Sequence, residues 1–200
     1  MSYTYRYFKQ PHAFSTFGGE PKECGICEAV APGYEGPFIG EGDLDFACES
    51  CLHSGRLAED DFATNAGDGA ALRVAIAAAN PGLPAARVEA LAGERTAELH
   101  HRTPQITTWQ DLTWPVHCSD YCRYEKEAGR ADLVAMAGPA DPKRFFVNHL
   151  HPEYRGTDLD HLWQSIRADS PQDNSAAYDT TAYLFACVEC GEAVILWDCS

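Results

Sequence analysis

The sequence predicts an α+β protein in which two cysteine-bearing hairpin elements, one near each end, are joined by a helical middle region. Three observations predict this arrangement. Close pairs of cysteines recur along the chain, an alanine-rich stretch of helical pattern lies between them, and residues of strand character flank the last pair. The four pairs are Cys24–Cys27, Cys48–Cys51, Cys118–Cys122 and Cys187–Cys190.

Length and composition favour one integrated domain. The chain has 200 residues and is 45% hydrophobic, which is enough to fill a core. We divide it into a cysteine-bearing N-terminal segment (1–56), a helical spacer (57–100) and a C-terminal α+β part (101–200). These three parts are expected to pack together.

The charge of the chain argues against two classes of partner. The formal net charge is -15, whereas binding to nucleic acid or to an anionic membrane needs clustered Lys and Arg. The sequence shows neither a signal segment nor an apolar run of about 18 residues. We therefore expect a cytoplasmic protein that binds neither nucleic acid nor membrane.

The N-terminal segment predicts short strands and turns. Tyr5, Tyr7 and Phe8 alternate in part like a strand, which Pro11 should end. The stretch Pro32–Pro37 favours a turn, and a short strand at Phe38 and Ile39 should follow it.

Two helices are predicted in the spacer. Asp68 is a favoured N-cap residue, and Asn80-Pro81-Gly82 should end the first helix. Pro84 suits the start of the second helix. The apolar residues along these helices are Leu72, Val74 and Ile76 in the first and Val88, Leu91 and Leu99 in the second.

The C-terminal part predicts a further helix and a final hairpin. Thr157 is placed to cap a helix whose apolar residues repeat at i, i+3, i+4 and i+7. Strands at Thr180–Cys187 and Ala193–Trp197 flank the last cysteine pair, which resembles a rubredoxin-like knuckle. Gly191 is free to take the positive φ of such a turn. The helical repeat consists of Leu159, Leu162, Trp163 and Ile166.

In a reducing compartment, spaced cysteine pairs are more often metal ligands than disulfides. The first two pairs, separated by residues 28–47, have the spacing of a treble-clef or ribbon-type zinc site. Four thiolates close the coordination sphere of Zn²⁺, so this site is expected to stabilise structure and not to activate water. His53 is interpreted as a surface residue. The predicted ligands are Cys24, Cys27, Cys48 and Cys51.

The second predicted zinc site consists of Cys118, Cys122, Cys187 and Cys190, which gives two zinc ions per chain. The adjacent His117 competes for a place, and if Cys118 points away a Cys₃His site remains open. Iron is an alternative metal, and buried free thiols or a redox pair are alternative roles. Cys199 has no close mate and is interpreted as a leftover thiol.

Two functions remain open. The first is a non-enzymatic interaction or stress-response module, held together by zinc, that meets a protein partner. The second is an enzyme or small-molecule binder that uses Arg102, Trp109, Trp114 and His117, because these offer an anion clamp, flat apolar faces and an acid–base group. No catalytic residue is assigned, because nothing completes a nucleophile, base and oxyanion set.

These landmarks together resemble the CbrC family of uncharacterised bacterial proteins, which is named for a colicin-tolerance phenotype. The resemblance is carried by the order and spacing of the cysteine pairs, of Arg102-Thr103-Pro104 ahead of Trp109-Gln110, and of Trp114 to Cys122. It implies a cytoplasmic bacterial protein with paired cysteine sets, and no established activity.

Overall fold

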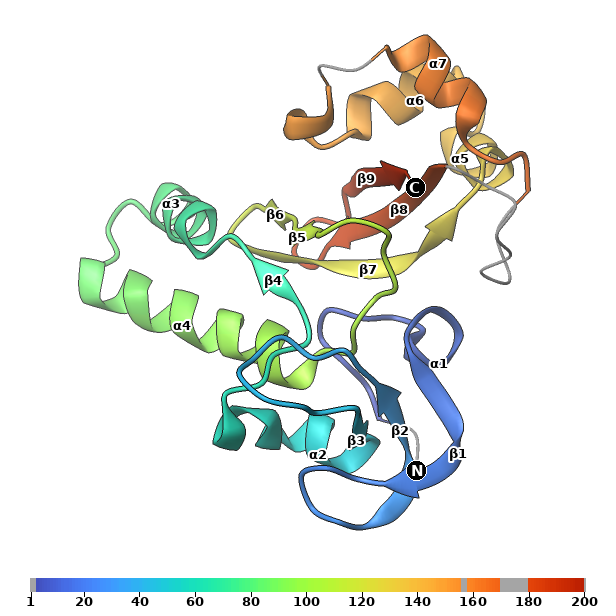
Figure 1. Cartoon of the computed structure of the whole chain (residues 1–200). Coiled ribbons are helices and arrows are strands. Elements are labelled where there is room, and N and C mark those ends of the chain that lie inside the picture. Colours follow the sequence, from blue (N-terminus) through green and yellow to red (C-terminus); the bar gives the residue numbers. More distant parts are fainter. Residues whose placement is uncertain (1–2, 156–157, 170–179, 200) are drawn as a thin grey trace.

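Three small sheets and the helices around them give the chain an α+β architecture (Figure 1), which confirms the predicted fold class. The structure is a computed structural model that describes residues 3–155, 158–169 and 180–199. The sheets have the orders β1-β2-β3, β4-β5 and β6-β7-β8-β9. The strands are β1 (Phe17–Glu23), β2 (Val30–Glu35), β3 (Phe46–Cys48), β4 (Ala66–Gly67), β5 (Thr113–Trp114), β6 (Val116–His117), β7 (Asp120–Ala128), β8 (Thr180–Cys187) and β9 (Ala193–Cys199). The α-helices are α1 (Pro11–Phe14), α2 (Glu49–Ser54), α3 (Gly69–Ala79), α4 (Ala85–Arg102), α5 (Arg130–Ala137), α6 (Pro142–His149) and α7 (Leu159–Ser165), and two 3₁₀ turns are η1 (Arg56–Asp60) and η2 (Pro152–Tyr154).

The N-terminal aromatic segment lies along the four-stranded sheet β6-β7-β8-β9, called the large sheet below, but does not form a regular strand. A single parallel bridge joins Phe8 to Tyr124 of β7. The Tyr124 N–H donates to the Tyr7 carbonyl at 2.8 Å, and the Lys9 N–H donates to the Tyr124 carbonyl at 3.0 Å. Pro11, which was expected to end a strand, is the first residue of α1. The strand predicted at Phe38 and Ile39 is likewise reduced to one bridge, between Ile39 and Ala63.

The two spacer helices are confirmed at their start signals. The Asp68 carboxylate accepts hydrogen bonds from the N–H groups of Ala70 and Ala71, so it caps α3. Helix α4 begins directly after Pro84. Val74 is 70% exposed, because a spacing of two residues places it on the opposite helical face from the buried Leu72 and Ile76.

Strands β8 and β9 separate two hydrophobic cores. Tyr183 and Phe185 of β8 pack into the main core with the N-terminal half of the chain. Ala182 and Leu184 point to the other face, where a second core gathers residues of α5, α6 and α7. Figure 1 shows these three helices on one side of the large sheet and the N-terminal half on the other.

Of the remaining local predictions, the turn between β8 and β9 is confirmed, and the predicted helix at Leu159 is present. Thr157, the predicted cap, lies outside the described residues, and the cap of α7 is Asp158, whose carboxylate accepts from the N–H groups of Asp160 and His161. The hairpin turn between β8 and β9 is confirmed, with Gly191 at φ 76°. Helices α1, α2, α5 and α6 were not predicted from the sequence.

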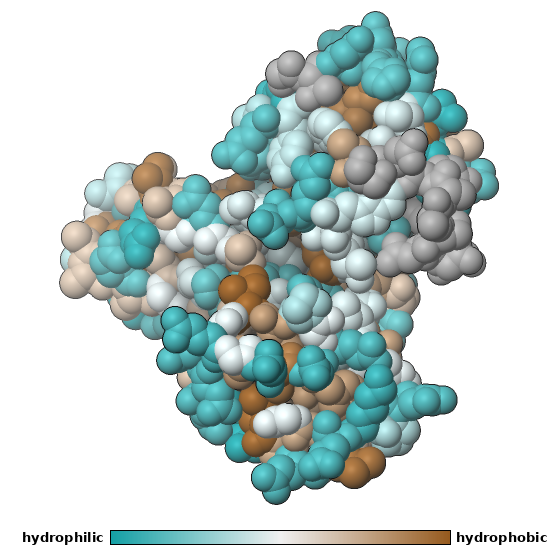
Figure 2. All heavy atoms as spheres, viewed as in Figure 1, coloured by the Kyte–Doolittle hydropathy of each residue, from teal (hydrophilic) through white to brown (hydrophobic). Residues whose placement is uncertain are grey.

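The face of the molecule drawn in Figure 2 has both hydrophilic and hydrophobic areas. Figure 2 shows hydrophilic residues over most of the upper part of the visible face and a hydrophobic band lower down, over the N-terminal half. Within the described residues, no helix is both long and apolar enough to span a bilayer.

Candidate metal centres

The first group of thiols forms where a hairpin turn meets the start of a helix. Cys24 and Cys27 lie in the turn between β1 and β2, Cys48 ends β3, and Cys51 lies in the first turn of α2. The ligand atoms of these four residues all lie within 4.8 Å of one another. The arrangement of knuckle and helix start agrees with the treble-clef geometry expected from the spacing.

The distance between the sulfurs of Cys27 and Cys48 fits a metal tetrahedron. Cys27 Sγ and Cys48 Sγ are 3.8 Å apart. Zn–S bonds of about 2.3 Å place the sulfurs of a regular tetrahedron about 3.8 Å apart. The thiols therefore lie at the separation that a central zinc ion would require.

Electrostatics in this group also favour a cation. Burial raises the pKa of Cys24, but N–H groups of Cys48, Ile26 and Cys27 more than offset it and lower the pKa to about 7. The Cys48 N–H lies 3.2 Å from Cys24 Sγ. In contrast, burial raises the pKa of Cys48 and of Cys51, and for Cys51 the neighbouring thiols raise it further. Four thiolates so close together repel one another unless a divalent cation lies between them.

The second group forms where two hairpin turns meet. His117 ends β6, and Cys118 lies in the two-residue turn to β7. Cys187 ends β8, and Cys190 lies in the turn to β9. Strands β7 and β8 are antiparallel, so β7 begins where β8 ends. Both turns therefore lie at the same end of the large sheet (Figure 1). The ligand atoms of these four residues also lie within 4.8 Å of one another.

The geometry of the second group fits one nitrogen and three sulfurs. His117 Nδ1 lies 3.4 Å from Cys118 Sγ and 3.6 Å from Cys190 Sγ, and these two sulfurs are 3.7 Å apart. A tetrahedral zinc with bonds of about 2.3 Å to sulfur and 2.0–2.1 Å to nitrogen places nitrogen and sulfur about 3.6 Å apart. The Glu189 N–H lies 3.4 Å from Cys187 Sγ, as is usual in a knuckle.

Cys122 lies outside this group, which corrects the set predicted from the sequence. The side chain is fully buried in the main core, and burial raises the pKa of its thiol. The reason is the hairpin register. His117 pairs with Asp120 across the turn, so Cys118 lies at the tip while Cys122 is already inside β7. His117 was considered as a substitute for Cys118, but it lies beside Cys118 and takes the place of Cys122.

The four residues of the alternative prediction do not converge. Arg102 contacts Glu98 at 3.9 Å, Trp109 is 40% exposed, Trp114 is buried at 1%, and His117 belongs to the second thiol group. Of these four residues, Trp114 alone lines the cavity of about 430 Å³ that lies between Phe38, Gln105 and Leu112. The stretch therefore supplies two exposed or half-exposed residues, one core residue and one member of the second thiol group, and these four share no pocket among the described residues.

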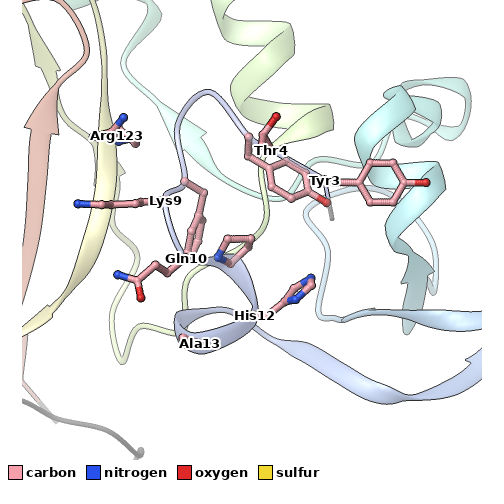
Figure 3. Close-up of a pocket in the computed structure, with 10 residues that line it drawn as sticks. Tyr3, Thr4, Lys9, Gln10, His12, Ala13 and Arg123 are labelled. Atoms are coloured by element: carbon pink, nitrogen blue, oxygen red, sulfur yellow. The ribbon is translucent and has the colours of Figure 1, made fainter. Parts of the chain in front are cut away.

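A larger cavity lies under the N-terminal segment. Its volume is about 540 Å³, and its basic side chains are Lys9, His12 and Arg123 (Figure 3). Each has an acidic partner. Lys9 and Arg123 both bind Glu125, and His12 Nε2 lies 2.7 Å from the Glu49 carboxylate. These basic side chains already have acidic partners within the protein, so the lining of the cavity does not indicate a particular ligand.

A buried carboxylate, that of Asp120, lies next to the second group. Asp120 is fully buried and accepts a hydrogen bond of 2.6 Å from the Tyr7 hydroxyl. It also binds Arg6 and lies 3.6 Å from Arg95 Nε. The network ties the N-terminal segment and α4 to the start of β7. No sequence pattern marks it, because its members are far apart in the chain.

A family model described as an uncharacterised protein family, UPF0167, matches residues 3–199. The chain belongs to this family. Among its curated relatives are the UPF0167 protein Mb2317 of Mycobacterium bovis, 28% identical, and the UPF0167 protein PA1536 of Pseudomonas aeruginosa, 25% identical. Both alignments span 193 residues and 94% of this chain, and they cover 88% and 92% of the respective relative. No solved structure matches the chain significantly.

Proposed function

We propose that this UPF0167 protein is a zinc-stabilised, non-enzymatic interaction module of the cytoplasm. The two zinc ions hold distant parts of the chain together. Cys24, Cys27, Cys48 and Cys51 bind the first ion, and His117, Cys118, Cys187 and Cys190 bind the second. The resemblance of the sequence to the CbrC family, which is named for a colicin-tolerance phenotype, supports including a stress-response role in the proposal.

The observation that carries this proposal is the spacing of the ligand atoms. The four distances between ligand atoms given above, one in the first group and three in the second, agree within about 0.2 Å with the edges of a zinc tetrahedron. Each group has four ligands, so neither leaves a coordination position open for water or substrate. Closed sites of this kind stabilise a fold and do not activate a nucleophile.

The surface supports an interaction role. With a formal net charge of -15, the chain favours a partner with a basic surface. Several large apolar side chains are exposed, among them Val30 at 70%, Ile39 at 51% and Trp109 at 40%. A cytoplasmic location keeps the thiols reduced and available as ligands.

We expect the purified chain to contain two zinc ions. Mass spectrometry of the native protein should show a mass increase of two zinc ions, and elemental analysis should find zinc and little iron. Zinc is favoured over iron because one set contains a histidine, and Zn²⁺ accepts mixed Cys and His ligands readily. A metal-free folded protein would contradict the proposal.

Two variants distinguish the ligand sets for the second ion. His117→Ala removes the ligand Nδ1 and should leave one ion after challenge with a chelator such as EDTA. Cys122→Ala removes a thiol outside the group and should keep both ions, although the small cavity lowers stability somewhat. Loss of one ion in Cys122→Ala, with retention in His117→Ala, would restore the set predicted from the sequence.

A further inference from the structure

The two thiol groups differ sharply in their access to solvent. In the first, Cys24, Cys48 and Cys51 are no more than 3% exposed, and Cys27 is partly exposed. In the second, Cys118 and Cys190 are both exposed, and only Cys187 is buried. Small oxidants in solution therefore reach two thiols of the second group directly, whereas three of the four thiols of the first group are shielded.

The exposed thiols of the second group also lie next to each other. Cys118 Sγ and Cys190 Sγ are 3.7 Å apart. Each belongs to the tight turn of a different hairpin, and residues at such turns move more easily than residues inside a strand. A disulfide needs the sulfurs at about 2.05 Å, so a shift of the two turns by less than about 2 Å brings them together.

We propose that Cys118 and Cys190 form an oxidation site for peroxides, and that their oxidation releases the second zinc ion while the first stays bound. This inference rests on the proposed function, because it presumes that both groups hold zinc. It assigns different roles to the two ions. The first is permanent, and the second can be released.

The chemistry balances with one molecule of hydrogen peroxide. The Cys118 thiolate attacks a peroxide oxygen, the O–O bond breaks, and a sulfenic acid and a hydroxide ion form. The Cys190 thiolate then attacks the sulfenic sulfur and expels a second hydroxide ion, which leaves a disulfide. Two electrons pass from the thiolates to the peroxide. Zinc keeps only His117 and Cys187 as ligands and departs into water.

The new disulfide would join the same two hairpins that the zinc had joined. Turns β6–β7 and β8–β9 therefore stay connected after the ion leaves, and the sheet is preserved. The oxidised chain differs from the reduced one mainly at its surface, where a negatively charged zinc-thiolate cluster becomes a neutral disulfide with a free His117. That change is suited to altering a partner contact at this end of the sheet.

The test treats the full-length protein, loaded with two zinc ions, with hydrogen peroxide in the presence of the zinc dye 4-(2-pyridylazo)resorcinol. We expect the second ion to be released, and the first ion to leave at least about tenfold more slowly because three of its four thiols are buried. Tandem mass spectrometry of the digested product should find Cys118 linked to Cys190. Dithiothreitol with added zinc should restore two ions.

Cys199→Ser provides the matched control, because Cys199 is a partly exposed thiol outside both groups. Its release kinetics should equal those of the unaltered chain. Equal rates for both ions, faster loss from the first group, or a disulfide that does not join Cys118 to Cys190 would each overturn the inference. If the untreated protein holds fewer than two zinc ions, the proposed function fails before oxidant is added, and the inference falls with it.

Discussion

Replacing Cys27 with serine should lower the free energy of unfolding by more than about 4 kcal/mol, because the first zinc ion loses a ligand. Cys27 is only partly buried, so its packing contributes little and the loss reports the metal. For a chain of this size, such a loss lowers the melting temperature by about 10 °C or more. Thermal unfolding followed by circular dichroism measures it.

Two comparisons make this result specific. Cys199→Ser makes the same chemical change at a thiol outside both groups, and it should melt like the unaltered chain. A strong chelator should bring the unaltered chain close to the melting temperature of Cys27→Ser. If Cys27→Ser melts normally and chelator has no effect, the first ion has no structural role.

Trp114→Ala should have the second large effect, a loss of about 3–5 kcal/mol in the free energy of unfolding. The side chain is 1% exposed, and its ring packs edge-on against Phe185 with centroids 5.2 Å apart. Its indole N–H donates to the Cys122 carbonyl at 2.7 Å. Truncation therefore removes a large apolar group and leaves a buried acceptor without its donor. Chemical denaturation followed by circular dichroism measures the change.

Trp109→Ala is the matched control, five residues away in the same stretch. Trp109 is 40% exposed, and its backbone N–H, which donates to Asp198 at 2.8 Å, survives the substitution. We expect a loss below about 1 kcal/mol. Equal effects at the two tryptophans would contradict the burial difference on which the alternative function was set aside.

The first thiol group could be predicted from the sequence, because its information is local. Two CxxC pairs each fix a turn that directs both sulfurs to one point, and the intervening chain needs only to return. The spacer helices were predictable for the same reason, since Asp68 and Pro84 mark their starts within a few residues.

The second thiol group could be predicted only in part. Its membership depends on the register of the β6–β7 hairpin, which cysteine spacing does not encode. Shifting that register would exchange the tip residue for a strand residue, and so His117 and Cys122 could not be separated by spacing alone. Of the helices that were not predicted, α5 and α6 were missed for different reasons. Asp141 before Pro142 was a usable start signal for α6, whereas α5 follows Gly129 and has little amphipathic pattern.

The zinc K-edge X-ray absorption spectrum of the purified chain tests the two proposed sites together. One site of four sulfurs and one of three sulfurs and a nitrogen predict an average of about 3.5 sulfurs at about 2.3 Å and about half a nitrogen at 2.0–2.1 Å per zinc. His117→Ala, with one ion left, should shift the average toward four sulfurs. A first shell dominated by oxygen or nitrogen, or a zinc content near zero, would contradict the account.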